Sequence, residues 1–591
     1  MGDHRRFYGI GTRGGRKRQD GIVQETSRIM KNSLFVHDEP GTHTPLFLDE
    51  CTFAAAIQCT CLLACTWLFF ILDINLSRST LYFALFITAA IMLIRGFLYR
   101  FKTCVAVFLF TIAFTLLCIG AEALVPDVSY DGMAYHQVSI ISLMSGWNPI
   151  YAPHVVDWWI RTFPQKAYLG YLIADAGIWT DHYPNGSWVL GAAVSSAFDS
   201  LNASKWTQPY FCGLSALVFY RGIRDLKLPA IFAASAAAIA ALSPVVLAQL
   251  RTNYVDGLLS CAILIQVGAS ISWYLNRTWT SLAMTMFGCL IAVNLKFTGA
   301  IYSLTILLIM ISMALARARL SRAEILALFT GVALTISVSA PTYVRNALTY
   351  GHPFYPLNQI DVMNGQAPAG FLAQNRWAKF VQATFLLPGD DFVDQHIRMP
   401  RLWHYYAAVN RPDNRDIGFG SLFGYSLALC GFLAPLLVCS VLRQWHRADS
   451  RLVCLAGVSG AILLSVIINP EFWWARYVPQ LWFIPILAAI ALVMVGLKRV
   501  GVILLGTALL GTALAFVFWA QQTINSAYAN PYRFLASDDS DKVILVRGIN
   551  RDHGAFVLAY EVERLGKQLA FTDHPESCKR EVRIGIVVVC L

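Results

Sequence analysis

TCVAVFLFTIAFTLLCIGAEALVPDVSYDGMAYHQ, residues 103–137, joins an apolar run directly to a cluster of polar and aromatic side chains. The run over 103–125 has the length of about 20 residues that spans the hydrocarbon core of a bilayer. The end of the stretch places Asp131 beside Tyr130, Tyr135 and His136. A carboxylate at the edge of a membrane is costly unless it is paired or faces water. We therefore expect a membrane protein with a functional site at this end of the span.

The composition extends this interpretation to the whole chain. Of the 591 residues, 57% are hydrophobic and 14% are charged, whereas soluble proteins have about a quarter charged residues. Apolar runs recur from residue 52 to residue 520, and we predict about thirteen transmembrane helices. The predicted spans are 52–74, 80–99, 103–125, 208–225, 229–249, 254–275, 279–295, 299–316, 323–341, 417–441, 452–469, 477–497 and 500–520. The predicted fold class is a polytopic α-helical membrane protein.

The basic residues set the orientation of these spans. The formal net charge is +11, and basic side chains gather in the N-terminal segment 1–51 and in alternate short loops. The loop residues are Arg95, Arg100, Lys102, Arg221, Arg224, Lys227, Arg277, Arg317, Arg319, Arg322, Arg443, Arg447, Arg451, Lys498 and Arg499. Cytoplasmic loops carry an excess of Lys and Arg. We therefore expect segment 1–51 to be a disordered cytoplasmic tail, and we do not expect nucleic acid as a partner.

Three long segments then lie on the outer side, at 126–207, 342–416 and 521–591. The first is rich in Trp and Tyr, and its pattern predicts short amphipathic helices along the membrane surface. The last contains DKVILVRGI, GAFVLAYEVERLG and VRIGIVVVCL, whose order of strand, helix and strand predicts a small α/β domain. Cys578 and Cys590 would face an oxidising compartment there, where they could pair or stay free.

Five ionisable residues fall at span ends on the predicted outer side. They are Asp131, Asp256 in RTNYVDGLL, Lys296 in VNLKFTGA, Arg345 in PTYVRNALTYGHPFYPL and Arg476 in NPEFWWARYVPQ. Such residues near a bilayer are candidates for a functional site. Arg and Lys suit a phosphate group, and a carboxylate that faces a hydroxyl can act as a general base. Each residue also has a structural alternative: a base can extend to lipid headgroups, and Asp256 can stabilise the first turn of its helix.

These motifs resemble the membrane glycosyltransferases of the GT-C fold, which take a sugar from a polyprenyl-phosphate carrier. Within that fold, the chain resembles bacterial relatives of the protein O-mannosyltransferase and lipid A aminoarabinose transferase group. SYDGMAYHQ looks like the acidic motif that begins their first outer loop, and TNYVDGL, LKFTG, YVRNALTYGHPFYPL and WARYVPQ look like stretches at their cavity. The resemblance covers roughly residues 100–500. This chain departs from the pattern in two ways: Gly132 stands where many members have a second acid, and the motif follows the third predicted helix instead of the first.

The resemblance implies a GT-C-like transmembrane region over 52–520, with surface jaw helices in 126–207. Asp131 would be the catalytic base, and Lys296, Arg345 and Arg476 would bind the lipid phosphate. Asp256, Tyr135, His136, His182 and Tyr183 are further candidates for substrate binding, with orientation of Asp131 or sugar binding as the role of the pair in DHYPNGSW. A lone His beside an aromatic helix is more often structural.

The implied reaction is an inverting transfer of the sugar to a hydroxyl of an envelope glycan, lipid or protein. The partners are membrane lipid and the polyprenyl-phosphate sugar; no cofactor is required, although a divalent metal is compatible. We expect the site to face the periplasm from a bacterial inner membrane. Two alternatives remain: a flippase or transporter of a lipid-linked sugar, and a glycan polymerase or ligase that uses a lipid-diphosphate donor. Transporters often show internal repeats, and the sequence has no clear repeat.

Overall fold

A computed structural model describes residues 46–98, 101–361, 369–385, 426–431, 433–434, 449–528, 535, 543–547, 554–572, 581–584 and 587–590. Three predictions therefore lie wholly or largely outside the described residues. They are the disordered tail, the span 417–441 and the pairing of Cys578 with Cys590.

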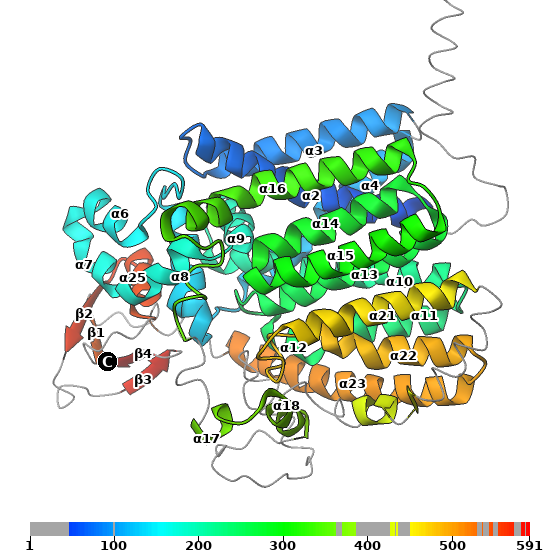
Figure 1. The fold of residues 1–591 in the computed structure, drawn as a ribbon. Coiled ribbons are helices and arrows are strands. Elements are labelled where there is room, and N and C mark those ends of the chain that lie inside the picture. The colour runs from blue at the N-terminus through cyan, green and yellow to red at the C-terminus, as the bar shows by residue number, and fades with distance from the viewer. Residues whose placement is uncertain are drawn as a thin grey trace, which may run out of the picture. The chain divides into compact units, whose positions relative to one another are not determined.

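Eight helices within the described residues are long and apolar enough to cross a membrane. They are α2 (Leu46–Ile71), α3 (Arg78–Leu98), α4 (Phe101–Ala123), α13 (Asp256–Asn276), α15 (Phe297–Arg317), α16 (Arg322–Tyr350), α21 (Ser450–Ile468) and α23 (Lys498–Tyr528). Figure 1 shows them packed side by side. The chain is a multi-pass helical membrane protein, as the composition predicted.

Other helices occupy the remaining predicted spans that lie within the described residues. They are α10 (Thr207–Asp225), α11 (Ala230–Ala241), α12 (Pro244–Gln249), α14 (Trp279–Leu295) and α22 (Phe483–Met494), which follows a 3₁₀ turn, η4 (Pro479–Trp482). The prediction of one continuous helix over 229–249 is wrong. The helix stops after Ala241 because Pro244 lacks a backbone N–H, and the Ser243 side chain accepts a hydrogen bond from the backbone N–H of Val246 to start α12.

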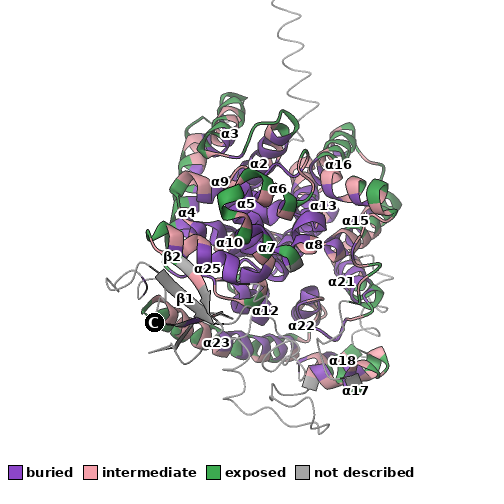
Figure 2. Cartoon of the chain, turned by 90° about the vertical axis from the view of Figure 1, so that its left-hand side faces the viewer, coloured by how far each residue is buried: buried purple, intermediate pink, exposed green. Residues whose placement is uncertain are grey.

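Helix α13 forms the centre of the bundle. Every residue from Asp256 to Tyr274 is buried, and α10, α12, α14 and α15 pack against it. Figure 2 shows mostly buried residues in the middle of the bundle, where α13 is labelled. Close approach needs small side chains, and Gly268 provides one. A Cβ atom on Gly268 would lie 2.6 Å from the Cα of Phe219 in α10. The two helices thus touch backbone to backbone, and α13 carries its N-terminal Asp256 on a rigid support.

The segment 126–207 folds into short helices. They are one π-helical turn, η1 (Gly132–His136), then α5 (Gln137–Met144), α6 (Val155–Thr162), η2 (Pro164–Lys166), α7 (Ala167–Leu172), α8 (Ala174–His182), α9 (Gly186–Phe198) and η3 (Leu201–Trp206). Helix α6 is amphipathic, and it buries Val155 and Trp159 while its charged residues lie on the other side. The segment 342–416 contributes α17 (Ala369–Leu372) and α18 (Arg376–Phe385). Lys379 of α18 pairs with Glu471 at 2.9 Å, which attaches α18 to the turn after α21.

The C-terminal residues form a four-stranded sheet with the order β2-β1-β4-β3. Its elements are β1 (Val543–Arg547), α25 (Ala555–Arg564), β2 (Gln568–Thr572), β3 (Glu581–Ile584) and β4 (Val587–Cys590). Strand β1 is parallel to β2, with Val543 opposite Gln568, and β4 is antiparallel to both β1 and β3. The prediction of one strand in VRIGIVVVCL is therefore wrong: the stretch supplies two antiparallel strands, and the strand that follows α25 is the short β2. Helix α25 packs on α7 and α5, with Phe556 against Trp159.

The close contact at Gly268 predicts an unequal response to alanine. Gly268→Ala should lower the free energy of unfolding by about 2 kcal/mol, because the methyl group meets the backbone of α10. Gly506→Ala in α23 is the matched control, since a Cβ there has no atom within 4 Å, and it should be neutral or stabilising by up to about 1 kcal/mol. Thermal unfolding in detergent micelles measures both. Equal changes in the unfolding temperature of Gly268→Ala and Gly506→Ala would contradict the backbone contact between α10 and α13.

Candidate functional site

Four charged side chains from distant parts of the chain form one continuous set of ion pairs at one end of the helices. The Nη1 atom of Arg476 lies 2.7 Å from Oδ2 of Asp131 and 3.9 Å from Oδ2 of Asp256. The Nζ atom of Lys296 lies 2.5 Å from Oδ1 of Asp256. We call Asp131, Arg476, Asp256 and Lys296 the charge cluster. Four of the five ionisable residues chosen from the sequence thus lie together.

The local backbone explains why these side chains converge. Asp131 directly precedes the π-helical turn η1, a rare element that is frequent at functional sites. Asp256 is the first residue of α13. Lys296 is extended, with φ −157° and ψ 147°, and this single residue separates α14 from α15. Arg476 lies in the turns between α21 and η4. Each charge therefore sits where one helical element ends or another begins.

Aromatic rings surround the two bases. The guanidinium of Arg476 lies 4.4 Å from the ring centroid of Trp474 and 5.4 Å from that of Tyr254. The ammonium of Lys296 lies 4.3 Å from the ring centroid of Tyr477. A cation over an aromatic face gains about 0.5 to 2 kcal/mol, depending on its desolvation. The rings hold both bases in place and leave their N–H groups for anionic partners.

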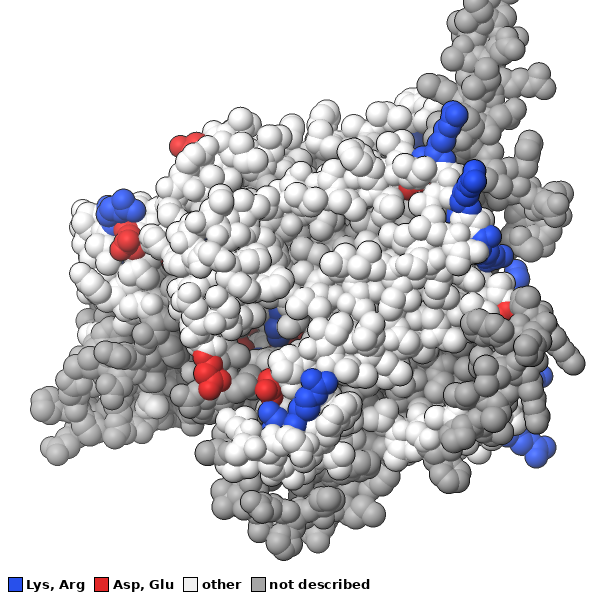
Figure 3. Space-filling view, viewed as in Figure 1, with Lys and Arg blue, Asp and Glu red and all other residues white. Residues whose placement is uncertain are grey.

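The members of the charge cluster differ in their access to solvent. The side chain of Asp256 is 3% exposed, whereas those of Arg476, Lys296 and Asp131 are 11%, 12% and 15% exposed. Figure 3 shows charged atoms inside a hollow on one face of the protein. Asp256 is therefore the inner acid, which supports the two bases, and Asp131 is the acid that a ligand can reach.

Tyr135, His136 and Tyr183 lie near the charge cluster, close enough for electrostatic interaction with Arg476. The indole N–H of Trp188 donates to Nδ1 of His136 at 2.7 Å, and Tyr254 stands against the same imidazole. Burial lowers the pKa of His136 to about 3, so the ring is neutral at pH 7. Tyr135 contacts both His136 and Tyr183. These three residues form an aromatic wall, in which His136 is fully buried.

His182 and Arg345 lie apart from the charge cluster. Nδ1 of His182 is 3.1 Å from Oδ1 of Asn346, and its ring packs against Tyr350 and Tyr355. Nη1 of Arg345 donates to the carbonyl of Pro149 at 3.1 Å. Both residues connect α16 to the segment 126–207. The sequence predicted that five ionisable residues converge. Four of them meet in the charge cluster, whereas Arg345 binds the carbonyl of Pro149.

Another buried acid, Asp181 in α8, lies near Arg345. Its Oδ1 accepts the backbone N–H of Val155 at 2.9 Å, which caps the start of α6, and its Oδ2 lies 3.4 Å from Nδ1 of His154. Burial raises the pKa of Asp181 to about 6, and the hydrogen bonds from Val155 and His154 oppose this rise. Burial also lowers the pKa of His182 to about 4. This group fixes the orientation of α6 relative to α8.

The sequence analysis missed two residues that shape the site. Asp127 is 3% exposed and binds the backbone N–H groups of Ser129 and Asn253. The sequence analysis did not single it out, although its position four residues before Asp131 was a usable signal. Gln249 donates to Asp256 at 3.3 Å and accepts the backbone N–H of Gly257 at 2.7 Å. For Gln249, the usable signal in the sequence was a side-chain amide at the end of an apolar run.

Among the described residues, no group of three or more His, Cys, Asp or Glu side chains is arranged to hold a metal ion. The charge cluster contains two carboxylates, but each already faces a cation. The positive charge that an anionic ligand would meet here comes from Arg476 and Lys296.

The buried pair predicts strong coupling between Lys296 and Asp256. Lys296→Met or Asp256→Asn alone should lower the free energy of unfolding by about 3 kcal/mol, because each leaves the other group without its partner. The double variant should lose clearly less than the sum of the two. Denaturation in micelles measures the cycle. Additive losses would show that the pair is not energetically coupled.

Asp181 predicts a pH dependence of stability. Its pKa is about 6 when folded against a reference value of 3.8, so the folded protein binds this proton more tightly than the unfolded chain. The resulting stability is full below about pH 4 and is lost as the pH rises through 6. Asp181→Asn cannot ionise, so it should gain stability relative to wild type between pH 4 and pH 7, by up to about 2 kcal/mol. The control His154→Gln keeps the carboxyl and should still lose stability as the pH rises, at a pH no lower than in wild type, because an interaction that opposes the rise of the Asp181 pKa is removed. Parallel plots of stability against pH for wild type and Asp181→Asn would contradict the assignment.

Comparison with known proteins gives one solved structure to report. No family model matches the sequence, and no curated protein matches it. The crystal structure of ArnT from Cupriavidus metallidurans bound to undecaprenyl phosphate is similar over 82% of this chain and 97% of that chain, with 12% identity and a TM-score of 0.37. A likeness this distant assigns neither an activity nor a ligand to this chain.

Proposed function

We propose that this protein is a GT-C-type membrane glycosyltransferase that moves a sugar from a polyprenyl-phosphate carrier to a hydroxyl group of a cell-envelope acceptor. The observation that carries the proposal is the position of Arg476 between two carboxylates, with Lys296 on the inner one. A site of this kind can bind an anionic group and accept a proton within a few ångströms. Those are the two operations that transfer from a sugar phosphate requires.

The charges of the cluster suggest how the donor binds. Two acids and two bases balance in the free protein. A phosphodiester that enters the hollow brings a negative charge, and Arg476 can exchange its hydrogen bond with Asp131 for one with a phosphate oxygen. Asp256 keeps Lys296 and Arg476 in place from beneath. Phosphate binding in this way leaves the carboxylate of Asp131 free to meet the acceptor.

The reaction then needs one displacement. Asp131 accepts the proton of the acceptor hydroxyl as its oxygen attacks the anomeric carbon of the sugar. The bond from that carbon to the phosphate oxygen breaks, and the lipid phosphate leaves with the bonding electrons, stabilised by Arg476 and Lys296. A single in-line attack inverts the anomeric configuration. Tyr135 and Tyr183 stand close enough to the cluster to contact the sugar, and His136 supports them from behind.

The other two candidates take different places in this proposal. His182 and Arg345 bind to α16 and the jaw helices, and not to the charge cluster, in the contacts described above. We propose that they hold the jaw helices over the site and act on substrate only through that placement. The lipid phosphate is assigned to Arg476 and Lys296.

Sidedness follows from the charges on the surface. In Figure 3, Lys and Arg side chains gather along one edge of the face, and a broad band without charge separates them from the hollow. The residues of the charge cluster lie at the opposite ends of their helices from Arg277, Arg317 and Arg451. If the basic ends are cytoplasmic, the site faces the outer side, which is the periplasm in a bacterial inner membrane.

The test is sugar transfer by the purified protein in proteoliposomes. The donor is radiolabelled sugar on membrane-derived polyprenyl phosphate, and the acceptors are envelope fractions. Asp131→Asn should lower kcat by about 10²- to 10⁴-fold, because it removes the general base and nearly preserves volume. Asp157→Asn changes an exposed acid of α6 and should keep full activity.

Each other outcome has a distinct meaning. Equal activity of Asp131→Asn and wild type would remove Asp131 as the base. Absence of transfer by wild type, together with intact translocation of the carrier, would favour a flippase. Transfer only from a lipid-diphosphate donor would favour a polymerase or ligase.

A further inference from the structure

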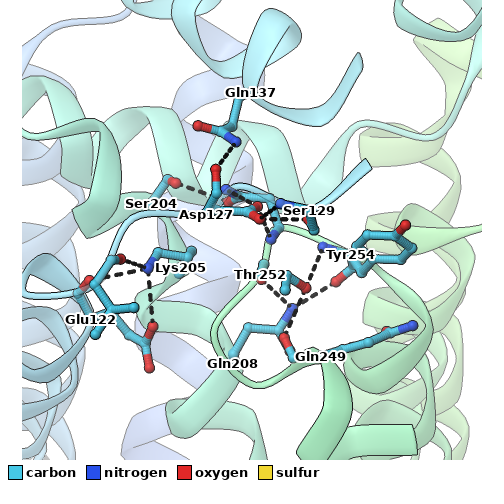
Figure 4. A network of polar contacts seen from close by, with 12 residues as sticks. Glu122, Asp127, Ser129, Gln137, Ser204, Lys205, Gln208, Gln249, Thr252 and Tyr254 are labelled. Atoms are coloured by element: carbon cyan, nitrogen blue, oxygen red, sulfur yellow. Dashed lines mark hydrogen bonds and ion pairs between the residues drawn. The ribbon is translucent and has the colours of Figure 1, made fainter. Parts of the chain in front are cut away.

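The proposed reaction leaves Asp127 without a role, although this acid is the centre of the polar network in Figure 4. Its Oδ1 accepts from the backbone N–H of Ser129 at 3.0 Å and from the Ser129 hydroxyl at 2.5 Å. Its Oδ2 accepts from the backbone N–H of Asn253 at 2.7 Å and from the Asn253 side-chain amide at 3.0 Å. Its backbone carbonyl accepts from Gln137 at 2.8 Å. The carboxylate therefore uses both oxygens and has four donors.

These bonds connect the two segments that carry the acids of the charge cluster. Ser129 lies two residues before Asp131, and Asn253 lies three residues before Asp256. Next to Asn253, the hydroxyl of Tyr254 accepts the backbone N–H of Asp131 at 3.2 Å. Asp127 and Tyr254 thus fix the backbone of Asp131 from two sides.

Both anchoring segments are themselves held. The side-chain amide of Gln208 donates to the carbonyls of Thr252 and Tyr254 at 3.0 and 2.6 Å. The buried ammonium of Lys205 donates to the carbonyls of Glu122 and Val125, just before Asp127. The position of Asp127 is therefore fixed relative to η3, α10 and α13.

Gly132 supplies an independent observation. A Cβ atom at this position would lie 2.4 Å from Oδ2 of Asp127 and 2.3 Å from the hydroxyl of Ser129. Neither atom is free to move, because each takes part in the hydrogen bonds of the network. The carboxylate of Asp127 thus packs against the backbone directly after Asp131. This contact also explains why a second acid directly after Asp131 is incompatible with this chain.

We propose that Asp127 is a positioning residue that sets the carboxylate of Asp131 at the charge cluster; the inference rests on the proposed function. Asp127, Ser129, Gly132 and Asn253 form what we call the brace. Through the brace, the first turn of η1 starts at a fixed distance from α13, so that Asp131 meets Arg476. Asp127 itself touches neither the hollow nor the reacting atoms.

The chemistry of the brace requires a carboxylate. All four groups that face the Asp127 oxygens are donors. In Asp127→Asn, the new NH₂ group must face either the donors of Ser129 or those of Asn253, so one side of the brace opens at nearly constant volume. A misplacement of about 1 Å at a reacting group can lower a rate by about 10²-fold.

The experiment compares kinetics of full-length protein in proteoliposomes. Asp127→Asn and Gly132→Ala should lower kcat by about 10²-fold and change KM for the polyprenyl-phosphate sugar by less than about threefold, since the phosphate ligands stay in place. In the Asp131→Asn background, Asp127→Asn should cause little further loss of kcat, because the group that it positions is gone. The proposal would be overturned if Asp127→Asn lowered kcat by the same factor in the Asp131→Asn variant as in wild type. It would also be overturned if Asp127→Asn raised KM without lowering kcat.

The matched control is Asp225→Asn. Asp225 is a buried acid paired with Arg221 at the far end of α10, so its loss lowers stability without reaching the site, and kcat should stay within about twofold of wild type. A comparable loss of kcat in this control would show that general destabilisation explains the defect. If Asp127→Asn does not fold, Ser129→Ala, which removes one of the four donors, should give a smaller loss of kcat with unchanged KM, and unchanged kcat would count against the brace.

Hydrogen exchange separates failure of the brace from failure of the proposed function. In Asp127→Asn, exchange should increase in the peptide that covers residues 128–135 and stay as in wild type in α10. Unchanged exchange at 128–135 would overturn the brace, whatever the activity. If wild type transfers no sugar and the exchange still increases locally, the brace stands as a structural feature and both the proposed function and the positioning of a catalytic base fall.

Discussion

The ion pair between Arg476 and Asp131 is the interaction on which the rest of the site depends. It joins residues that are 345 positions apart, and it places a positive and a negative charge where a membrane span ends. Neither charge is stable there alone, because desolvation of an unpaired ion costs several kcal/mol. Arg476 also faces Asp256, which in turn binds Lys296. The segments before η1, α13, α15 and η4 must therefore meet at one point, and α13 supplies the rigid centre.

The same balance of charge makes the site responsive to an anion. A cluster with equal numbers of acids and bases has no net attraction for phosphate until one ion pair opens. Asp131 is the more exposed of the two acids and the one that a ligand can reach, whereas Asp256, which faces both bases, lies deeper. Binding of the donor and release of the base are thus coupled through a single guanidinium. The brace around Asp127 keeps Asp131 in place while its partner changes.

Much of this arrangement could be predicted from residues at the ends of apolar runs. Asp131, Asp256, Lys296 and Arg476 were recognisable because the bilayer restricts where a charge can lie, and all four lie together. Arg345 satisfies the same rule but meets a different partner, since span length fixes the depth of a residue and not the neighbour that it faces. His182, chosen from DHYPNGSW, binds Asn346 instead of the charge cluster. Asp127 was missed because one of the two partner residues of its carboxylate, Asn253, is distant in the sequence. Only the packing of α10 and α13 brings Asn253 near Asp127. The break at Pro244 and the hairpin of β3 and β4 were missed because apolar content alone does not mark a helix cap or a turn.

The most direct test of the central claim is a cryo-EM structure of the protein with undecaprenyl phosphate, as a representative polyprenyl monophosphate, in lipid nanodiscs. The account predicts phosphate density within hydrogen-bond distance of Arg476 and Lys296. It also predicts that Arg476 has turned from Asp131 and that the Asp131 carboxylate faces open solvent, with the bonds of Asp127 intact. A phosphate bound elsewhere, with the pair of Arg476 and Asp131 still closed, would contradict it.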